Sequence, residues 1–151
     1  AAKIMPKVVE WRRHFHQFPE LSNREVNTAK FVADELRKLG IEVRTGIAKT
    51  GVVGILKGGS PGPVVGLRAD MDALPVTERN SLPFASHETA DFNGQKVGVM
   101  HACGHDVHAS WTVGAAMLLR KSPADGDVLV LLEREGLHVE QDQVDVGEFL
   151  V

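Results

Sequence analysis

The chain has 151 residues, of which 43% are hydrophobic and 25% are charged, and its formal net charge at pH 7 is -3. This composition is typical of one folded domain that can bury a core. The absence of a basic run argues against nucleic acid as a partner, and the absence of a long apolar run argues against a membrane-spanning helix. We expect a cytoplasmic location, with a periplasmic or secreted one left open because a removed signal leaves no trace.

Two helices are predicted in the first forty residues. Apolar residues recur at helical spacing over residues 3–17 and again from Val26 to Leu39. The segment Ser22–Glu25 has the pattern of a capping box for the second helix. Gly40 is the expected left-handed residue that ends this helix.

Strand patterns follow the second helix. Four strands are predicted, over residues 41–44, 51–56, 64–70 and 126–132. The run 64–70 is continuously apolar until it ends in charge, which is typical of a strand buried on both faces of an α/β sheet. Residues 73–98 are predicted to be a loop and residues 107–119 a helix with a buried face.

The order of these elements predicts a layered α/β domain rather than a bundle or a β-sandwich. We place this domain at residues 1–132. Residues 133–151 are acidic and only weakly periodic, so we treat them as an atypical tail that is not assigned to the fold.

Two carboxylates mark the end of the third predicted strand. Asp70 and Asp72 are separated by one residue, so on a strand their side chains point to the same face. Open α/β sheets bind ligands at the carboxyl ends of their strands. Two adjacent negative charges favour a cation or a proton between them, although a pair of solvated loop carboxylates fits the sequence equally well.

A second cluster holds four candidate metal ligands within eight residues. They are His101, Cys103, His105 and His108. In an extended segment Cys103 and His105 would reach one ion, and Gly104 lets the backbone turn between them. Asp106 is a candidate for orienting a ligand imidazole from behind. A thiolate beside imidazoles favours zinc, cobalt, nickel or manganese over calcium or magnesium.

Two other interpretations of this cluster are possible. Buried histidines can pack around a core cysteine by chance, and a closed structural zinc site usually needs more than the single cysteine of this chain. The remaining histidines are expected to have plainer roles. His14 and His16 are predicted to be structural hydrogen-bonding groups, and His87 is predicted to be solvated.

Three motifs in order resemble those of the metal-dependent N-acyl-amino-acid amidohydrolases, which include hippurate hydrolases, aminoacylase-like carboxypeptidases and plant auxin-conjugate hydrolases. They are WRRHFHQFPELS at 11–22, LRADMDALP at 67–75 and GVMHACGHDVH at 98–108. The resemblance implies a zinc-peptidase-like α/β/α catalytic domain with a smaller inserted dimerisation or lid domain. It also implies two divalent transition-metal ions per site, with zinc favoured over manganese, cobalt or nickel.

The resemblance further implies roles for particular residues. Cys103 and His105 would ligate metal, Asp72 would be a catalytic residue beside the site, and Asp70 would lie on its floor. A water activated by the metal would hydrolyse the amide of a small N-acyl amino acid or a related peptide-like substrate, with a glutamate as general base.

The sequence departs from the family pattern after the last predicted strand. Where family members carry Gln-Pro-Ala-Glu-Glu-Gly, this chain reads Leu-Glu-Arg-Glu-Gly over 132–136. Glu133 and Glu135 are the candidates to replace the glutamate pair, with Glu135 taken as the candidate base. His138 faintly matches the last histidine ligand of the family. No inserted domain is recognisable, so the catalytic domain is expected to be incomplete.

Three functions are therefore considered. The first is a metal-dependent amidohydrolase acting on N-acyl amino acids. The second is a catalytically inactive, truncated fragment that retains the fold and partial metal binding. The third is a non-enzymatic interaction module that uses the acidic tail. We also expect the chain to form a homo-oligomer through exposed apolar surface.

Overall fold

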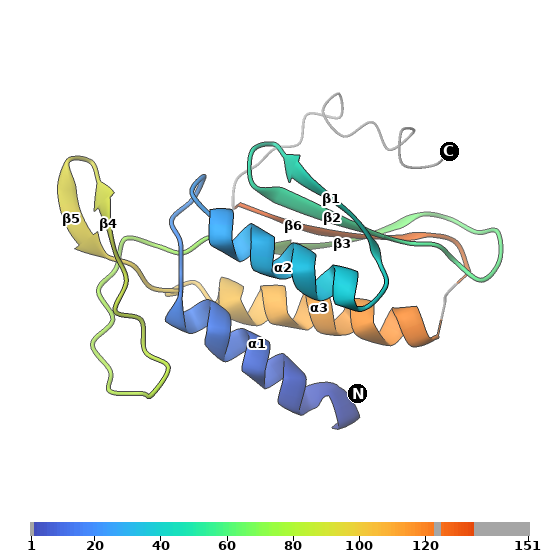
Figure 1. Ribbon diagram of the computed structural model, residues 1–151, viewed down its shortest axis with the longest axis horizontal. Helices are drawn as coiled ribbons and strands as arrows, with labels where there is room; N and C mark the ends of the chain where they lie inside the picture. The colour runs from blue at the N-terminus through green and yellow to red at the C-terminus, as the bar shows by residue number, and fades with distance from the viewer. Residues whose placement is uncertain (1, 123–124, 135–151) are drawn as a thin grey trace.

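The computed structural model describes residues 2–122 and 125–134 (Figure 1). The helices are α1 (Met5–Gln17), α2 (Val26–Lys38) and α3 (His105–Lys121), with a 3-10 turn at Ala2–Ile4 before α1. The strands are β1 (Glu42–Ile47), β2 (Gly51–Leu56), β3 (Val65–Asp70), β4 (Thr89–Phe92), β5 (Gln95–Gly98) and β6 (Val128–Glu133). The predicted layered α/β organisation is confirmed, and the last strand extends one residue past the predicted end.

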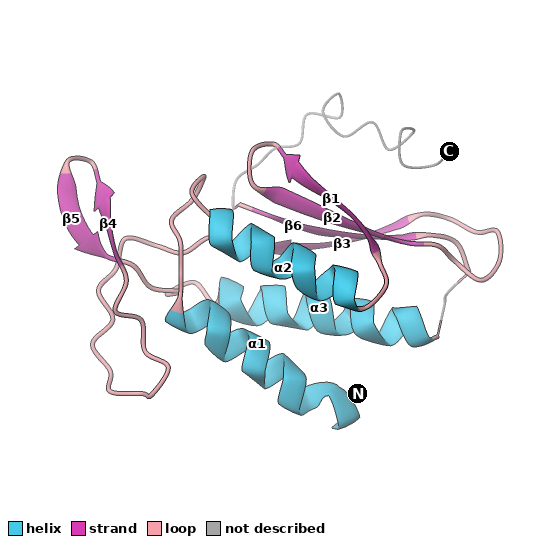
Figure 2. Ribbon diagram, in the orientation of Figure 1, coloured by secondary structure: helices cyan, strands magenta, loops and turns pink. Residues whose placement is uncertain are grey.

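The main sheet has the strand order β1-β2-β6-β3. Strand β6 runs antiparallel to β2 and parallel to β3, so the carboxyl ends of β3 and β6 lie at the same edge. Alternate residues of each strand face the helices, and Val52, Val130 and Leu132 are fully buried there. The three helices of the described part of the chain gather on one side of this sheet (Figure 2).

The predicted helix faces form most of this core. Val8, Trp11 and Phe15 of α1 are buried as expected, and the Trp11 indole N–H donates a 2.8 Å hydrogen bond to Glu35 of α2. Helix α2 begins at Val26 as predicted, but the placement of Val26 in the buried stripe of this helix is wrong, because Val26 is 67% exposed.

The capping-box prediction is also wrong. Helix α2 begins at Val26, and the cap comes from Glu20, whose carboxylate accepts the backbone N–H groups of Asn27 at 3.2 Å and Thr28 at 2.8 Å. The Glu25 carboxylate instead accepts the hydroxyl of Thr50 at 2.8 Å. A carboxylate upstream in the sequence thus satisfies the unpaired amides and complements the positive end of the helix dipole.

Strand β3 is not buried on both faces as its apolar sequence predicts. It lies at one edge of the sheet, and Val65 is 48% exposed. Only Ala69 among its six residues is buried. The sequence pattern identifies the strand correctly but not its position, because a continuous apolar run says nothing about which neighbours are present.

Residues 73–98 are not simply a loop. Strands β4 and β5 form an antiparallel hairpin in which Phe92 pairs with Gln95. The turn between them is Asn93-Gly94, and both residues have positive φ, at 51° and 76°. Asn-Gly is the sequence preferred by two-residue hairpin turns with this backbone, so the signal for the hairpin was present in the sequence.

Near the amino-terminal ends of β3 and β6, two connecting segments pack directly against each other through their backbones. The segment between β2 and β3 contains Gly58 and Gly62, and the segment before β6 contains Gly126. A Cβ atom on Gly62 would lie 2.7 Å from the backbone nitrogen of Gly126, and a Cβ atom on Gly58 or Gly126 would overlap backbone atoms of the facing segment. Gly126 also has a φ of +78°, which disfavours any side chain.

Candidate metal site

His105 is the first residue of α3, two residues earlier than the predicted helix start. Cys103 and Gly104 form the turn before it, and Gly104 has a φ of +85°. The expectation that Cys103 and His105 lie in an extended segment is therefore wrong, because the chain turns sharply between them. Cys103 is exposed and is a free thiol.

The His105 imidazole is held by Asp72, the second residue after β3. Its Nδ1 lies 2.9 Å from the backbone carbonyl oxygen of Asp72 and 3.2 Å from the Asp72 Oδ1. Both side chains are buried. A histidine that donates from Nδ1 to a carboxylate or carbonyl binds metal through Nε2, and the partner behind it fixes the ring and raises its basicity.

Asp70 and Asp72 have separate partners. Asp70 forms a 3.3 Å ion pair with Arg68, whereas Asp72 contacts His105. Arg68 also pairs with Glu133, which lies opposite Asp70 in the register between β3 and β6. The two carboxylates thus have different neighbours, and the expected cation or proton between them stays a prediction.

His101 is a buried imidazole. The residue is 5% exposed, and among the residues that the structure describes neither Nδ1 nor Nε2 has a hydrogen-bond partner. Burial lowers the pKa of His101 to about 4, against the opposing effect of the nearby Asp106 carboxylate. The ring is therefore neutral at pH 7 and has one donor and one acceptor unmet.

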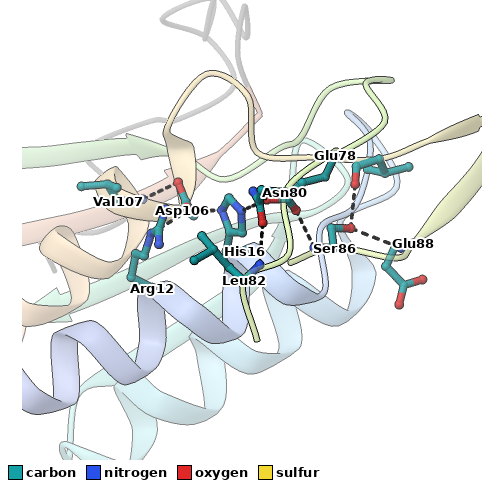
Figure 3. A network of polar contacts seen from close by, with 10 residues as sticks. Arg12, His16, Glu78, Asn80, Leu82, Ser86, Glu88, Asp106 and Val107 are labelled. Atoms are coloured by element: carbon teal, nitrogen blue, oxygen red, sulfur yellow. Dashed lines mark hydrogen bonds and ion pairs between the residues drawn. The ribbon is translucent and has the colours of Figure 1, made fainter. Parts of the chain in front are cut away.

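A second buried histidine, His16, is fully bonded (Figure 3). Its Nδ1 lies 2.7 Å from the Asp106 Oδ2, and its Nε2 lies 2.8 Å from the Glu78 Oε1. Arg12 adds a 2.9 Å contact from Nε to the same Asp106 oxygen. This network joins α1, the first turn of α3 and the segment before β4. The structural role predicted for His16 is confirmed, and Asp106 orients His16 rather than a candidate ligand.

Glu78 anchors its own segment as well as His16. Its carboxylate accepts the Ser86 backbone N–H and the Asn80 side-chain amide. Burial raises the pKa of Glu78, but the hydrogen bonds from His16, Ser86 and Asn80 outweigh burial and leave this pKa below its ordinary value. Sequence reasoning missed Glu78, because nothing in the sequence around it indicates a contact with α1.

The other histidines have different surroundings. The His14 ring stacks on Phe31 with 3.9 Å between ring centroids, and burial lowers the pKa of His14. The His108 ring centroid lies 5.9 Å from that of His105, on the first turn of α3. His87 is exposed, as predicted.

The donor chemistry at the start of α3 fits a transition metal, but the described residues do not assemble a complete site. Within residues 2–122 and 125–134, no group of three or more His, Cys, Asp or Glu residues is placed to hold an ion. Glu133 is engaged by Arg68. Glu135 and His138, the other two candidates from the sequence, lie outside the described residues. The same holds for most of the acidic tail.

Among the helices of the described part, none is long and apolar enough to cross a membrane.

Comparison with known proteins points to one family. Residues 66–135 match the model of peptidase family M20/M25/M40. The chain is 50% identical over 116 residues to thermostable carboxypeptidase 1 of Saccharolobus solfataricus, covering 76% of this chain and 28% of the relative. It is 41% identical over 133 residues to an N-acyl-L-amino acid amidohydrolase of Geobacillus stearothermophilus, covering 87% and 34%.

A solved structure agrees with these relatives. The Bacillus subtilis YXEP protein, described as a dinuclear metal-binding peptidase of the M20 family, superposes with a TM-score of 0.82 at 36% identity. The superposition covers 99% of this chain and 41% of that one. The chain thus spans about a third of the length of the curated relatives it matches.

Proposed function

Because the chain belongs to peptidase family M20/M25/M40, we propose that it carries the start of a metal-dependent amidohydrolase site, with Cys103 and His105 as metal ligands. The observation that supports this most directly is the placement of His105. Its Nδ1 is held by Asp72, which lies just after β3, and His105 itself is two residues from the exposed thiol of Cys103.

The proposed reaction is hydrolysis of the amide bond of a small N-acyl amino acid or a related peptide-like compound. Support comes from the relatives, one of which is an N-acyl-L-amino acid amidohydrolase. A divalent transition metal, zinc in our proposal and two ions per complete site, would supply a water whose pKa falls to about 7. Asp72 would act as a positioning residue that fixes the ring of His105.

Metal binding is tested with cobalt, because Co²⁺ occupies zinc sites and a thiolate ligand adds a charge-transfer absorption band. We expect this band on titration of the whole chain and its loss in Cys103→Ser. Asp72→Ala should keep the band and weaken cobalt binding by about 10- to 100-fold. The matched histidine control is His87→Ala, at an exposed loop position, which should bind as the wild type does, whereas His105→Ala should not.

Activity is tested separately. The zinc-, cobalt- or manganese-loaded chain is incubated with N-acetyl and N-benzoyl amino acids, and free amino acid is measured. Release that disappears in both Cys103→Ser and His105→Ala would support the amidohydrolase. Absence of release with every metal would count against activity of these 151 residues.

A second candidate function is favoured by the lack of a three-ligand group in residues 2–122 and 125–134. In this alternative the chain is an inactive fragment that keeps the fold and binds one ion through two protein ligands. Metal analysis after gel filtration separates the two candidates. Two tightly retained ions per chain would contradict the fragment, whereas one weakly held ion without hydrolysis would support it.

A further inference from the structure

The ring of His16 lies between two carboxylates (Figure 3). The Asp106 Oδ2 is 2.7 Å from the His16 Nδ1, and the Glu78 Oε1 is 2.8 Å from the His16 Nε2. Asp106 has two further partners, because its Oδ2 forms a 2.9 Å ion pair with the Arg12 Nε and its Oδ1 accepts the Val107 backbone N–H at 2.9 Å. Such partners on both oxygens favour the ionised form of the Asp106 carboxyl group.

Glu78 is ionised for a similar reason. Its Oε1 also accepts the Asn80 side-chain amide, and its Oε2 accepts the Ser86 backbone N–H. Burial raises the pKa of Glu78, but the hydrogen bonds to its carboxylate outweigh burial and lower this pKa below its ordinary value. Each ring nitrogen of His16 therefore faces a negative charge, although the side chains of His16 and Glu78 are almost wholly buried.

A neutral imidazole cannot donate in both contacts of His16. It carries one N–H, and its second nitrogen would turn a lone pair toward a carboxylate oxygen. Protons on both nitrogens make both contacts charge-assisted hydrogen bonds. The buried cluster then balances its charges, because Arg12 and His16 together match the two carboxylates. The nearby His101 stays neutral at pH 7, because burial lowers its pKa to about 4.

The cluster lies next to both members of the His105–Asp72 contact. Asp106 directly follows His105 at the start of α3, and Glu78 comes six residues after Asp72. One ring of α1 therefore joins the helix turn that carries the candidate ligand to the segment that follows its carboxylate partner. His16 contacts neither Cys103 nor His105 among the hydrogen bonds and ion pairs of the described residues.

We propose that His16 is a positioning residue of the metal site, with a proton on each ring nitrogen, and that it clamps Asp106 to Glu78. This clamp fixes the turn that carries His105 relative to the segment that follows Asp72, so less ordering remains to be done when metal binds. The role of His16 rests on the proposed function, because it takes His105 as a metal ligand. The protonation of the ring is measurable without any metal.

The protonation of His16 is measured by nuclear magnetic resonance on the whole, metal-free chain labelled with ¹⁵N. Correlations between the carbon-bound ring protons and the ring nitrogens distinguish a doubly protonated imidazole from a neutral one. The His16 signals are assigned by their contacts with Phe84, whose ring centroid lies 5.8 Å away. We expect both nitrogens to be protonated at about pH 7.5, where a free histidine is mostly neutral. In Glu78→Gln the ring should be mostly neutral, because the amide can donate to it.

Metal binding is measured by the cobalt titration. His16→Gln and Glu78→Gln should each weaken cobalt binding by about three- to tenfold, less than Asp72→Ala does, because they act through the neighbours of His105. The position of the thiolate band should not change, since the ligands are the same. If His16→Gln does not fold by circular dichroism, Glu78→Gln alone decides this comparison.

The matched control for a merely structural effect is Trp11→Phe. It removes another buried hydrogen bond of α1, the 2.8 Å bond from the indole N–H to Glu35, and should leave cobalt binding as in the wild type. A wild-type His16 with only one protonated nitrogen would overturn the proposal. So would cobalt binding that Glu78→Gln leaves unchanged, or that Trp11→Phe weakens equally.

Failure of the proposed function has a different signature. A wild-type chain without the cobalt band would overturn the proposed function and, with it, the positioning role of His16. Failure of the positioning role alone would leave the wild-type band in place, so the two failures are distinguishable.

Discussion

Two buried histidines near the start of α3 differ in their surroundings. Both ring nitrogens of His16 contact carboxylates, those of Asp106 and Glu78. Within residues 2–122 and 125–134, neither ring nitrogen of His101 has a hydrogen-bond partner. A buried polar group that is fully bonded stabilises one arrangement of the chain, whereas an unbonded one costs about 1–3 kcal/mol. The comparison indicates that the His16 network stabilises the fold, whereas the unbonded ring of His101 lowers stability.

The largest effect is expected when the bonded network is broken. Asp106→Ala leaves Arg12 and His16 without their shared carboxylate, and should lower the free energy of unfolding by about 3–5 kcal/mol. Urea unfolding measures this loss. The matched control is Asp34→Ala, which removes exposed ion pairs with Lys30 and Arg37 and should lower the free energy of unfolding far less, because solvent screens them. Equal losses of stability in the two variants would show that the buried network contributes no more to stability than an exposed ion pair does.

A smaller effect is expected from acid. The pKa of Glu78 is lowered in the folded chain, so the unfolded chain binds the proton more tightly. The stability contributed by Glu78 is therefore complete above its ordinary pKa of 4.5 and is lost as the pH falls below that value. Urea unfolding midpoints measured across this range should fall less steeply in Glu78→Gln than in the wild type.

The control for acid sensitivity is Glu88→Gln, an exposed residue of the same segment. It should leave the slope of stability against pH as in the wild type. If Glu78→Gln and Glu88→Gln both match the wild-type slope, the ion pair with His16 does not contribute to acid unfolding.

The smallest effect is expected at the unbonded histidine, and it has the opposite sign. His101→Phe replaces the ring with an apolar one of similar shape and removes two unmet polar atoms, so stability should stay level or rise by about 1 kcal/mol. His16→Phe, the same change at the bonded histidine, should lower stability. Thermal unfolding compares the two, and a destabilised His101→Phe would mean that the ring has a partner in solution.

The helices and the strands of the main sheet could be predicted from sequence because their signals are local. The spacing of Val8, Trp11 and Phe15 identifies the buried face of α1 without any knowledge of its neighbours. The cap of α2 could not be predicted in the same way. Two carboxylates, Glu20 and Glu25, compete for the helix start, and the choice depends on how the chain bends at Asn23, whose φ is 65°.

In the candidate site, too, local signals could be predicted from the sequence and long-range contacts could not. The spacing of Cys103 and His105 points to metal chemistry, and their resemblance to a family motif is specific. The partner of His105 comes from Asp72, 33 residues away, and the partner of His16 comes from Glu78, 62 residues away. Such contacts are set by the crossing of α1 and α3 and by the end of β3. The roles of Cys103, His105, Glu135 and His138 as ligands or base stay predictions.

The glycine crossing at the far end of the sheet bears on how variation in this family should be interpreted. Gly58, Gly62 and Gly126 meet where no side chain fits, at the end opposite His105. In a saturation library selected only for folding, substitutions at these three glycines should therefore be rare. They should be as rare as substitutions of the metal ligands are in a library selected for activity. A lack of variation at these glycines would arise because no side chain fits between the two backbone segments. Comparing the two selections would distinguish this cause from a lack of variation at residues that bind metal or catalyse the reaction.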